Sequence, residues 1–570
     1  MQTFDVLVIG SGGAGMRAAL EAGARGRLSV GLMTKMFPTR SATGMAQGGI
    51  NGVLGNADPS DTVAKHIFDT VKGSDYLGDQ DAIAFFCGQA AAAIREIDYY
   101  GVPFSRDAKG QIAQRNFGGQ SAPRTCFSAD KTGHVILHTM YEQCLKHGVK
   151  MLTDRQLLDL AVDGDGLCGV VALDIRTGTV VPVKAKAVVV ATGGAGRMYW
   201  SRTTNPFTST ADGMAACFRA GIPLKDPEMV QFHPTGLAGT GILMSEASRA
   251  EGGYLYNNAG ERFMARYAPE KMELATRDLV SQAIETEIRE GRGFGEGMNA
   301  YVLLDLRHLG REKILERLPG IRDLAITFEQ VDPIEAPIPI RPSCHYTMGG
   351  VDVTNFRTGG TALAGLFAAG EAACVSIHGA NRLGGNSLAD IMVFGKCAGA
   401  GAADYAQAQV REAGDGALAA KAAEWEARLA AAMARGGGPA VASIRDRLAE
   451  AMWNKVGIFR RGAEMAAAAA IVDGLAAEYE RCAVGDDSRV FNTALVNYVE
   501  LGNLLAMAKA AVLGAINRTE SRGCHLREDY PARDDVNFLK HTLVTLAGSQ
   551  YELSYRPVVV TEHQPAERRY

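Results

Sequence analysis

The chain has 570 residues, enough for several domains, and 47% of them are hydrophobic, which is enough to build more than one core. No uninterrupted apolar run reaches the roughly 18 residues of a membrane-spanning helix, because charges such as Glu371, Glu500 and Lys509 break the most apolar stretches. The net charge of −4 and the lack of a basic tract argue against nucleic acid as a partner.

The N-terminal stretch MQTFDVLVIG has no basic region ahead of an apolar one, so we expect a first strand there and no export signal. The ten cysteines are scattered, without a CxxC, a CxxCH or a zinc-like pairing. We expect them to be reduced core residues in the cytosol. We therefore predict no metal site, haem or iron–sulfur cluster with a recognisable binding pattern in this chain.

The first predicted unit is a strand, FDVLVIG, then the turn GSGGAG at 10–15 and the helix MRAALEAGARG. The turn matches GxGxxG, the dinucleotide-binding pattern. Gly10 permits the tight turn, Gly12 lets the backbone approach a pyrophosphate, and Gly15 lets helix and strand pack closely. The N-terminus of the helix favours the anion.

The next strand, LSVGLMTK, ends in Thr34 and Lys35, without the acidic residue that usually holds an adenosine ribose. A later strand, AKAVVVATGG at 185–194, also ends in glycines. We expect it to reach the same nucleotide site from a doubly wound sheet. The alternative is a glycine-rich turn that binds nothing.

The residue composition changes twice further along the chain. Loops with Pro, Gly and aromatic residues precede helices in the next part, which indicates an inserted α+β domain, and GLFAAGEAA then returns to a Rossmann-like pattern. The last part is rich in alanine and amphipathic, as helical scaffolds are. We predict an α/β protein whose dinucleotide-binding domain is 1–225 and 347–415, with an inserted domain at 226–346, a helical domain at 416–532 and a C-terminal tail at 533–570.

Charged and imidazole groups stand among glycines and apolar residues, where solvated faces are not expected. They are His233 in QFHPTG, Ser245, Glu246 and Arg249 in SEASRAEGG, Arg277 in ATRDLVS, His345 in RPSCHYTMGG, and His378, Arg382 and Ser387 in HGANRLGGNSLAD. Taken singly, such residues are more often structural: a histidine before proline is usually a hydrogen-bonded turn residue. Together they describe a pocket rich in cationic donors, which suits a small dicarboxylate because guanidinium binds carboxylate at two points.

Nearly end to end, the chain resembles the flavoprotein subunits of succinate dehydrogenase and fumarate reductase. The motifs that carry the resemblance are GSGGAG, TKMFPTRS, GMAQGG, FSADKTGH, TSTADG, QFHPTG, SEASRAEGGY, ERFMARYAP, ATRDLVS, CHYTMGG, AGEAA, HGANRLGGNSLAD and RTESRGCHLREDYPARDD. The resemblance implies FAD in the Rossmann-like domain and a dicarboxylate between it and a mobile capping domain, the inserted segment.

The resemblance also implies roles for individual residues. FAD would contact Gly10, Ser11, Gly12, Gly13, Ala14, Gly15, Thr34, Lys35, Ser41, Ala42, Thr43, Gly48, Gly49, Ala191, Thr192, Gly193, Asp212, Glu371, Arg382, Ser387 and Leu388. One substrate carboxylate would meet His345 and Arg382. The other would meet His233, Ser245 and the backbone near Phe117 and Gly118.

Catalysis is assigned by the resemblance to Arg277, with Glu246 and Arg249 as a proton relay to solvent. A free arginine is always protonated at neutral pH. In a dry pocket beside a second cation, Arg277 can lend a proton in the transition state and recover it through the relay. A positioned proton donor is typically worth about 10²–10⁴-fold in rate. The implied reaction is hydride transfer between flavin N5 and one carbon of the C4 acid, with a proton at the neighbouring carbon.

Ala42 departs from the family pattern. In the respiratory members, the motif that matches TRSATGMAQGG carries a histidine there, which bonds covalently to the 8α-methyl group of the flavin. An alanine methyl cannot form that bond, so we expect non-covalent FAD. Covalent attachment raises the flavin potential, so its loss favours fumarate reduction over succinate oxidation.

Two other functions stay open at the level of sequence. L-aspartate oxidase is a relative that also lacks the histidine, and a weakly catalytic flavin-binding interaction subunit is an alternative of another class. The resemblance further implies an iron–sulfur subunit as electron partner, membrane anchor subunits, and a peripheral position on the cytoplasmic side of the inner membrane. The alternative is a free-standing reductase that uses a small diffusible donor.

Overall fold

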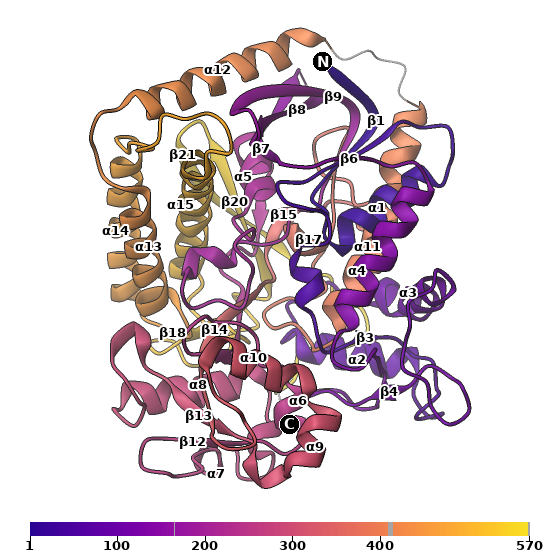
Figure 1. Cartoon of the computed structure of the whole chain (residues 1–570), viewed down its shortest axis with the longest axis vertical. Helices are drawn as coiled ribbons and strands as arrows, with labels where there is room; N and C mark the ends of the chain where they lie inside the picture. Colours follow the sequence, from indigo (N-terminus) through magenta and orange to yellow (C-terminus); the bar gives the residue numbers. More distant parts are fainter. Residues whose placement is uncertain (165, 409–413, 568–570) are drawn as a thin grey trace.

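The computed structural model describes residues 1–164, 166–408 and 414–567 (Figure 1). Its largest sheet has the strand order β6-β2-β1-β9-β8-β7, with β16 also paired to β9. These strands are β1 (Gln2–Ile9), β2 (Val30–Met33), β6 (Lys150–Leu152), β7 (Arg155–Asp163), β8 (Gly166–Asp174), β9 (Thr179–Val190) and β16 (Leu366–Ala368). β6, β2, β1, β9 and β16 run parallel, and β8 and β7 extend the sheet as an antiparallel hairpin. The predicted Rossmann-like α/β fold is confirmed.

Helices close to the sheet pack through small residues. They are α1 (Gly13–Gly23), α3 (Gln80–Tyr99), α4 (Thr132–Lys146), α5 (Asp212–Arg219), α11 (Asn386–Ala408) and α12 (Asp415–Ala434). A Cβ on Gly399 of α11 would stand 2.3 Å from the carbonyl oxygen of Ala18 in α1, so the two helices approach at a distance that only glycine allows. α12 contacts β7, β8 and β9 of the sheet, although the sequence grouped it with the helices that follow.

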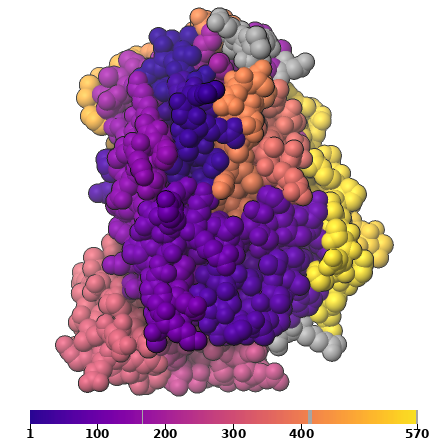
Figure 2. All heavy atoms as spheres, turned by 90° about the vertical axis from the view of Figure 1, so that its right-hand side faces the viewer, coloured from indigo at the N-terminus to yellow at the C-terminus, as the bar shows by residue number. Residues whose placement is uncertain are grey.

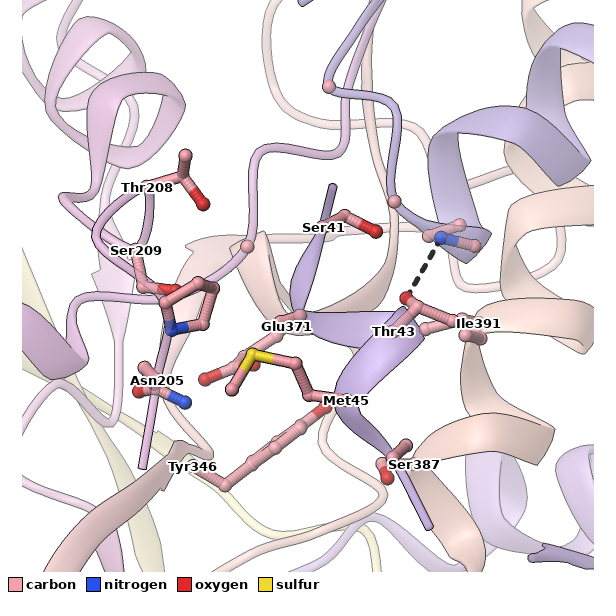
Figure 3. A pocket seen from close by; sticks show the side chains of 18 of the residues that line it. Ser41, Thr43, Met45, Asn205, Thr208, Ser209, Tyr346, Glu371, Ser387 and Ile391 are labelled. Atoms are coloured by element: carbon pink, nitrogen blue, oxygen red, sulfur yellow. Dashed lines mark hydrogen bonds between the residues drawn. The ribbon is translucent and has the colours of Figure 1, made fainter. Parts of the chain in front are cut away.

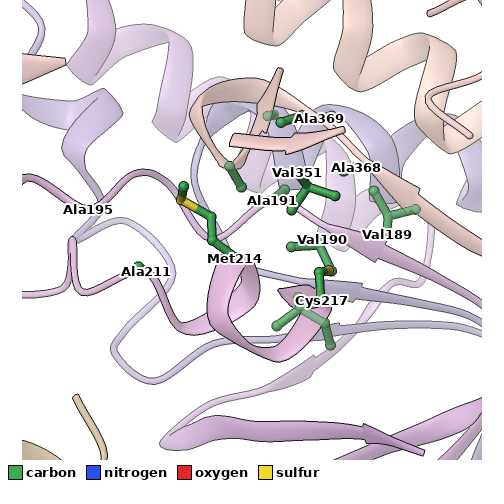
Figure 4. Close-up of a cluster of buried hydrophobic side chains, with 14 of the residues drawn as sticks. Val189, Val190, Ala191, Ala195, Ala211, Met214, Cys217, Val351, Ala368 and Ala369 are labelled. Atoms are coloured by element: carbon green, nitrogen blue, oxygen red, sulfur yellow. The ribbon is translucent and has the colours of Figure 1, made fainter. Parts of the chain in front are cut away.

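Figure 4 shows the core beside the nucleotide-binding edge of this sheet. Val190 of β9 lies beside Cys217 of α5, Val189 and Met214 belong to the same cluster, and all four are buried. Burial of this kind stabilises by about 25 cal/mol per Å² of apolar surface. The ten cysteines are free thiols, nine of them buried, in agreement with their expected place in the core.

The inserted segment builds a second antiparallel sheet with its own core, at the bottom of Figure 1. Its strand order is β11-β14-β13-β12, with β11 (Val230–Leu237), β12 (Tyr254–Tyr256), β13 (Val302–Asp305) and β14 (Ile338–Thr347). Helix α8 (Arg277–Arg289) packs on β11 and β14. The chain enters this unit along β11 and leaves along β14, which are paired neighbours, so both connections to the Rossmann-like domain lie side by side.

Three long helices follow in the C-terminal part: α13 (Val441–Val456), α14 (Gly462–Tyr479) and α15 (Thr493–Asn517). Among the helices of the described ranges, α15 alone is long and apolar enough to cross a membrane, but 72% of its apolar window is buried inside the protein. α15 packs against α13, α14 and α5, as the core helix of a globular domain does.

The segment predicted as a tail contains two strands. β20 (Lys540–Ala547) and β21 (Gln550–Pro557) form a hairpin that joins β10 (Leu224–Lys225), β15 (Gly350–Asp352) and β17 (Ala373–Cys374) in a further sheet. The chain then runs beside α3, where the amide of Gln80 bonds the backbone of residues 561–563. Figure 2 shows these C-terminal residues lying along the edge of the 60–100 region.

The other regular elements are short and connect these units. They are α2 (Val63–Gly73), α6 (Ala247–Ala250), α7 (Met264–Tyr267), α9 (Arg311–Arg317), α10 (Pro319–Glu329), β3 (Ile50–Asn51), β4 (Gln114–Arg115), β5 (Thr125–Cys126), β18 (Phe459–Arg460), β19 (Leu526–Arg527) and the 3₁₀ turn η1 (Ala42–Met45).

Candidate active site

A cavity of about 1670 Å³, counting the space open to solvent at its mouth, lies at the carboxyl ends of β1, β2, β9 and β16. Parallel sheets bind their ligands at this edge. Of the residues singled out from the sequence, those that line it are Gly10 to Ala14, Thr34, Lys35, Ser41 to Thr43, Gly48, Gly49, Phe117, Ala191 to Gly193, Asp212, His233, Ser245, Glu246, Arg277, His345, Glu371, Arg382, Ser387 and Leu388. Gly15, Gly118 and Arg249 lie behind this lining.

The glycine turn at one end of the cavity is built as its spacing predicts. Gly10 has φ +104°, and a Cβ there would stand 2.3 Å from the carbonyl oxygen of Ala191. A Cβ on Gly15 would stand 1.8 Å from the carbonyl oxygen of Gly10, so Gly15 serves the packing of α1 on β1 and does not face the cavity. The first turn of α1 is therefore held directly at the edge of the sheet.

Donors and hydroxyl groups at this end fit the pyrophosphate of a dinucleotide. The N-terminus of α1 faces the cavity, and a helix N-terminus favours anions. Gly13 N–H donates to Thr43 Oγ1 at 3.0 Å, the dashed line in Figure 3. Ser41 Oγ is buried and has no hydrogen-bond partner within the described part of the chain. Ala42, the first residue of η1, lines the cavity between these two hydroxyls with only a methyl group.

Lys35 has a more structural place than the sequence suggested. Its ammonium group lies 2.8 Å from Asp212 Oδ2 and 2.6 Å from Glu500 Oε1, and it donates to Thr210 Oγ1 at 2.6 Å. Burial opposes the charged form, but the two carboxylates raise the pKa of Lys35 above its ordinary value. Lys35 thus pairs with a second predicted cofactor residue, Asp212, and also with Glu500 of α15.

Sequence analysis missed part of the opposite wall. Figure 3 shows Asn205, Thr208, Ser209, Met45 and Tyr346 facing the same cavity as the predicted Glu371 and Ser387, and all of these residues line it. The polar run TTNPFTSTADG was the available signal, but only its end, TSTADG, was used, as a family motif. Glu371 accepts from the N–H of Thr347 at 2.9 Å, and burial raises the pKa of Glu371 to about 7.

At the other end of the cavity the inserted domain meets the Rossmann-like domain, and cationic and imidazole groups converge. Arg277 is the first residue of α8, His233 and His345 lie on the paired strands β11 and β14, and Arg382 precedes α11. The two imidazole rings lie 5.1 Å apart between centroids. The guanidinium of Arg382 donates to Ser387 Oγ at 3.3 Å and lies 4.6 Å from the ring centroid of Tyr346.

Both histidines are neutral. Burial, then the charge of Arg277, lowers the pKa of His233 well below its ordinary value; burial and Arg382 do the same for His345. Thr235 N–H donates to His233 Nδ1 at 3.2 Å, so the ring proton sits on Nε2. His345 Nδ1 lies 2.8 Å from Thr204 Oγ1, which leaves its Nε2 for a ligand.

Glu246 links the remaining predicted catalytic residues. Its Oε2 accepts from Arg277 Nε at 2.9 Å, and Arg249 Nη2 lies 3.9 Å from the same oxygen. Burial works against its ionised form, but the charges of Arg277 and Arg249 lower the pKa of Glu246 to about 2. The first link of the predicted relay is therefore a hydrogen bond, and the second is a longer ion pair behind the cavity wall.

Gly118 differs from its predicted place. Its N–H donates to Glu246 Oε1 at 3.1 Å, and Gly118 does not line the cavity. The contact with a substrate carboxylate that was predicted for it is not available in this arrangement, because the carboxylate of Glu246 already occupies the donor. Phe117, its neighbour, does line the cavity.

This end carries more positive charge than its carboxylates balance. Glu246 is the one carboxylate that ion-pairs with Arg277, and Arg382 has no ion pair among the described residues. Arg277 Nη1 and Arg382 Nε are buried without a hydrogen-bond partner in the same described ranges. Burial and repulsion from Arg277 lower the pKa of Arg382 to about 10. A small dianion would satisfy both guanidinium groups. Across the described residues, no group of three or more His, Cys, Asp or Glu side chains could hold a metal ion.

Comparison with protein families identifies two regions. A model described as an FAD binding domain matches residues 5–388, and a model described as the fumarate reductase flavoprotein C-terminus matches residues 445–570. Together they span the cavity, the inserted sheet and the C-terminal helices. The first alone covers more than half of the chain.

Individual relatives are similar over almost their whole length. The chain is 52% identical to the 8-methylmenaquinol:fumarate reductase flavoprotein subunit of Wolinella succinogenes, over 99% of this chain and 92% of the relative. It is 44% identical to the succinate dehydrogenase flavoprotein subunit of Rickettsia conorii, over 98% and 96%. Among solved structures, a quinol fumarate reductase flavoprotein of E. coli superposes with a TM-score of 0.95 at 41% identity, over 100% and 99% of the two chains.

Proposed function

This chain belongs to the family of fumarate reductase and succinate dehydrogenase flavoprotein subunits, and we propose that it interconverts fumarate and succinate with non-covalently bound FAD, with a bias to fumarate reduction. It is an FAD-dependent oxidoreductase by that membership. The single observation that carries the proposal is the pair Arg277 and Arg382 at one end of the dinucleotide cavity. Each has one buried guanidinium nitrogen without a hydrogen-bond partner among the described residues.

The cofactor is assigned to the other end. FAD, when bound, supplies the two-electron chemistry, because its flavin gives or takes a hydride. The turn from Gly10 to Ala14, the α1 N-terminus and the Ser41 and Thr43 hydroxyls would hold its pyrophosphate. Ala42 offers no nucleophile or ring nitrogen, so non-covalent binding follows from its side chain.

The protein's own groups bind and orient the dicarboxylate. We assign one carboxylate to Arg382 and His345 and the other to His233 and Ser245, all of which line the cavity. Neutral imidazole N–H groups and guanidinium groups draw electron density from a bound fumarate toward its carboxylates, which favours attack by hydride at carbon.

Arg277 is the proposed proton donor for the neighbouring carbon. Hydride and proton together convert fumarate to succinate, so the charges balance. Glu246 is ionised at rest and accepts a hydrogen bond from Arg277 Nε, and Arg249 lies behind Glu246. After Arg277 has given up its proton, a proton from solvent passes by way of Arg249 and Glu246 back to Arg277. In the reverse direction the same groups accept the proton from succinate, as microscopic reversibility requires.

We also propose that the chain works within a larger complex, with an iron–sulfur subunit and membrane anchor subunits, peripherally on the cytoplasmic side of the inner membrane. The Wolinella relative is named for a menaquinol and fumarate, and as a subunit. Quinols dissolve in membranes, so electrons need a path from there to the cavity. Purification from native membranes tests this: co-eluting iron and sulfide are expected, and a protein that fractionates alone at every salt concentration contradicts it.

The catalytic proposal is tested with the purified flavoprotein under anaerobic conditions. After dithionite reduction, fumarate should reoxidise the flavin within seconds, and L-aspartate given to the oxidised protein should yield no ammonia. Acid precipitation should leave all FAD in the supernatant. Flavin that stays reduced with fumarate, or yellow protein on a denaturing gel, would contradict the reaction and the mode of binding respectively.

A further inference from the structure

A second cleft lies between the C-terminal half of α8, the C-terminal end of α13 and the N-terminal end of α14. Figure 1 shows where these helices lie in the fold. It is lined by residues of both units, among them Glu285, Arg289, Trp453, Phe459 and Glu528. None of these was singled out from the sequence, and the proposed function does not use them. The cleft matters because α8, which forms one wall, begins at the proposed proton donor Arg277.

Two buried side chains of opposite charge meet in this cleft. Arg202 is 1% exposed and Glu285 is 6% exposed. Arg202 Nη1 lies 3.6 Å from Glu285 Oε2, and neither atom has a hydrogen-bond partner within the described part of the chain. A small movement of α8 toward Arg202 would turn this ion pair into a hydrogen bond.

Arg202 itself is held firmly. Its Nε donates to the carbonyl oxygen of Met298 at 3.0 Å and its Nη2 to that of Gly297 at 3.1 Å. Its guanidinium carbon lies 4.4 Å from the ring centroid of Trp453 in α13. The remaining nitrogen, Nη1, is thereby directed to Glu285.

The charge pairs continue outward but become weaker. Arg289 Nε lies 3.6 Å from Glu285 Oε1, and Arg289 Nη1 lies 4.0 Å from Glu528, which pairs with Arg461 at 2.7 Å. Arg289, Glu528 and Arg461 are half-exposed or exposed, where ion pairs contribute little. The buried pair of Arg202 and Glu285 is therefore the one that fixes the geometry.

This pair connects both halves of the cationic site. Arg202 lies two residues before Thr204, which contacts His345 Nδ1 at 2.8 Å, and Asn205 Nδ2 donates to the carbonyl oxygen of His345 at 3.0 Å. Glu285 lies on α8, whose first residue is Arg277. A helix is stiff and rises 1.5 Å per residue, so Arg277 lies about 12 Å from Glu285 along the helix axis. A tilt of α8 at Glu285 is therefore transmitted to Arg277.

We propose that Glu285 is a positioning residue: through its buried contact with Arg202 it holds α8 so that Arg277 stands opposite His345. This inference rests on the proposed role of Arg277. Loss of the contact lets α8 tilt, and Arg277 then delivers its proton from a poorer distance. A misplacement of about 1 Å can cost up to about 100-fold in rate.

The experiment uses the full FAD-loaded chain and three variants. Glu285→Gln keeps the shape and removes the charge, and Glu285→Leu removes the polar contact. Glu290→Gln is the matched control, since Glu290 lines the same cleft but, among the described residues, pairs with Arg292 of its own domain and not with Arg202. Fumarate-dependent reoxidation of the reduced flavin is followed in H₂O and in D₂O. Succinate affinity is measured from the flavin difference spectrum.

We expect the reoxidation rate to fall about 3-fold in Glu285→Gln and about 10-fold in Glu285→Leu, with succinate affinity changed less than 2-fold. The solvent isotope effect should grow in both, because proton delivery becomes slower, whereas Glu290→Gln should match the wild type. Unchanged rates and isotope effects in both Glu285 variants, or the same losses in Glu290→Gln, would overturn the proposal.

Hydrogen exchange separates this proposal from the catalytic one. The backbone amides in the first turns of α8 should exchange faster in Glu285→Leu than in the wild type and in Glu290→Gln, whatever the substrate is. If fumarate does not reoxidise the wild-type flavin, the proposed function fails. Faster exchange in Glu285→Leu, and not in Glu290→Gln, would still support the positioning of α8 by Glu285. Equal exchange in all three proteins would refute it.

Discussion

Two groups of buried basic side chains differ in how many carboxylates face them. Lys35 has two, Asp212 and Glu500, and His541 has two, with Nδ1 2.6 Å from Asp226 and Nε2 3.1 Å from Asp79. At the opposite end of the cavity, Arg277 pairs with the carboxylate of Glu246. Among the residues described, Arg382 pairs with no carboxylate and none contacts the two histidines.

The protonation states follow from that difference. Burial opposes charge everywhere, but Asp226 and Asp79 raise the pKa of His541 to about 9, whereas burial and the neighbouring arginines keep His233 and His345 neutral. A buried cation with its own carboxylates has no need of a ligand. A cluster of cations without them is stable only if something anionic arrives, so the imbalance of charge marks the site.

We expect the largest loss of activity from a substitution at the cationic end of the cavity, where Arg277 and Arg382 lie. Arg277→Lys should lower fumarate reduction by about 10²–10⁴-fold, because the shorter, point-like ammonium cannot both pair with Glu246 and reach the substrate. FAD content should stay normal. The measurement is steady-state fumarate reduction with a viologen donor, together with the flavin to protein ratio; Arg266→Lys on the same domain's surface is the control. Comparable turnover would remove Arg277 from the mechanism.

At the end of the cavity where Lys35 pairs with two carboxylates, a substitution should change the stability of the fold. Lys35→Met leaves Asp212 and Glu500 buried without their counter-ion, and breaking a buried pair in this way costs about 3–5 kcal/mol. We expect that loss in the free energy of unfolding, measured by urea denaturation. The exposed Lys146→Met should stay within about 0.5 kcal/mol of the wild type. If Lys35→Met kept full stability, Lys35 would not be the structural cation that its contacts indicate.

A pH titration of stability sharpens the same contrast. The folded pKa of His541, about 9, exceeds the unfolded value of about 6.5, so its stabilisation is complete below pH 6.5 and is lost as pH rises through 9. The shift corresponds to about 3 kcal/mol, from 1.36 kcal/mol per unit. Wild-type protein should lose this between pH 6.5 and 9, and His541→Gln should lack that dependence. Parallel pH curves for the two proteins would speak against a charged His541.

These contacts also mark where reasoning from sequence stops. The glycine turn, the strand ends and the polar motifs are each contained in a few consecutive residues, so Gly10, His233 and Arg382 could be assigned to one cavity from the sequence. Lys35 meets Glu500, which is 465 positions away, and only the folded chain brings them together. The sequence alone does not show whether a buried cation is neutralised by carboxylates of the protein or is available to bind an anionic ligand.

Short-range patterns failed in two further places for different reasons. The strand β21, after Gly548, alternates polar and apolar residues in QYELSYR, and β20 before it holds the apolar and β-branched run TLVTL; the expectation of a tail overlooked this hairpin pattern. Gly118 was assigned a substrate carboxylate, but its N–H points to Glu246. A backbone donor cannot be assigned to a ligand until the protein's own competing acceptors are known.

The smallest effect is expected from Ala42→His, which changes the cofactor end of the cavity and leaves the cationic end intact. Ala42→His introduces a ring nitrogen at a residue that lines the cavity, so covalent attachment of FAD becomes possible where the assembly factors are present. A covalent link raises the flavin potential, and each 30 mV is worth about 1.4 kcal/mol, or tenfold in the equilibrium of a two-electron couple. Succinate oxidation should therefore improve relative to fumarate reduction, while succinate affinity stays the same because Arg382 and His345 are untouched. The ratio of the two rates is measured only in protein whose flavin stays with the protein pellet after acid precipitation. An unchanged ratio in that protein would show that the bias toward fumarate does not come from Ala42.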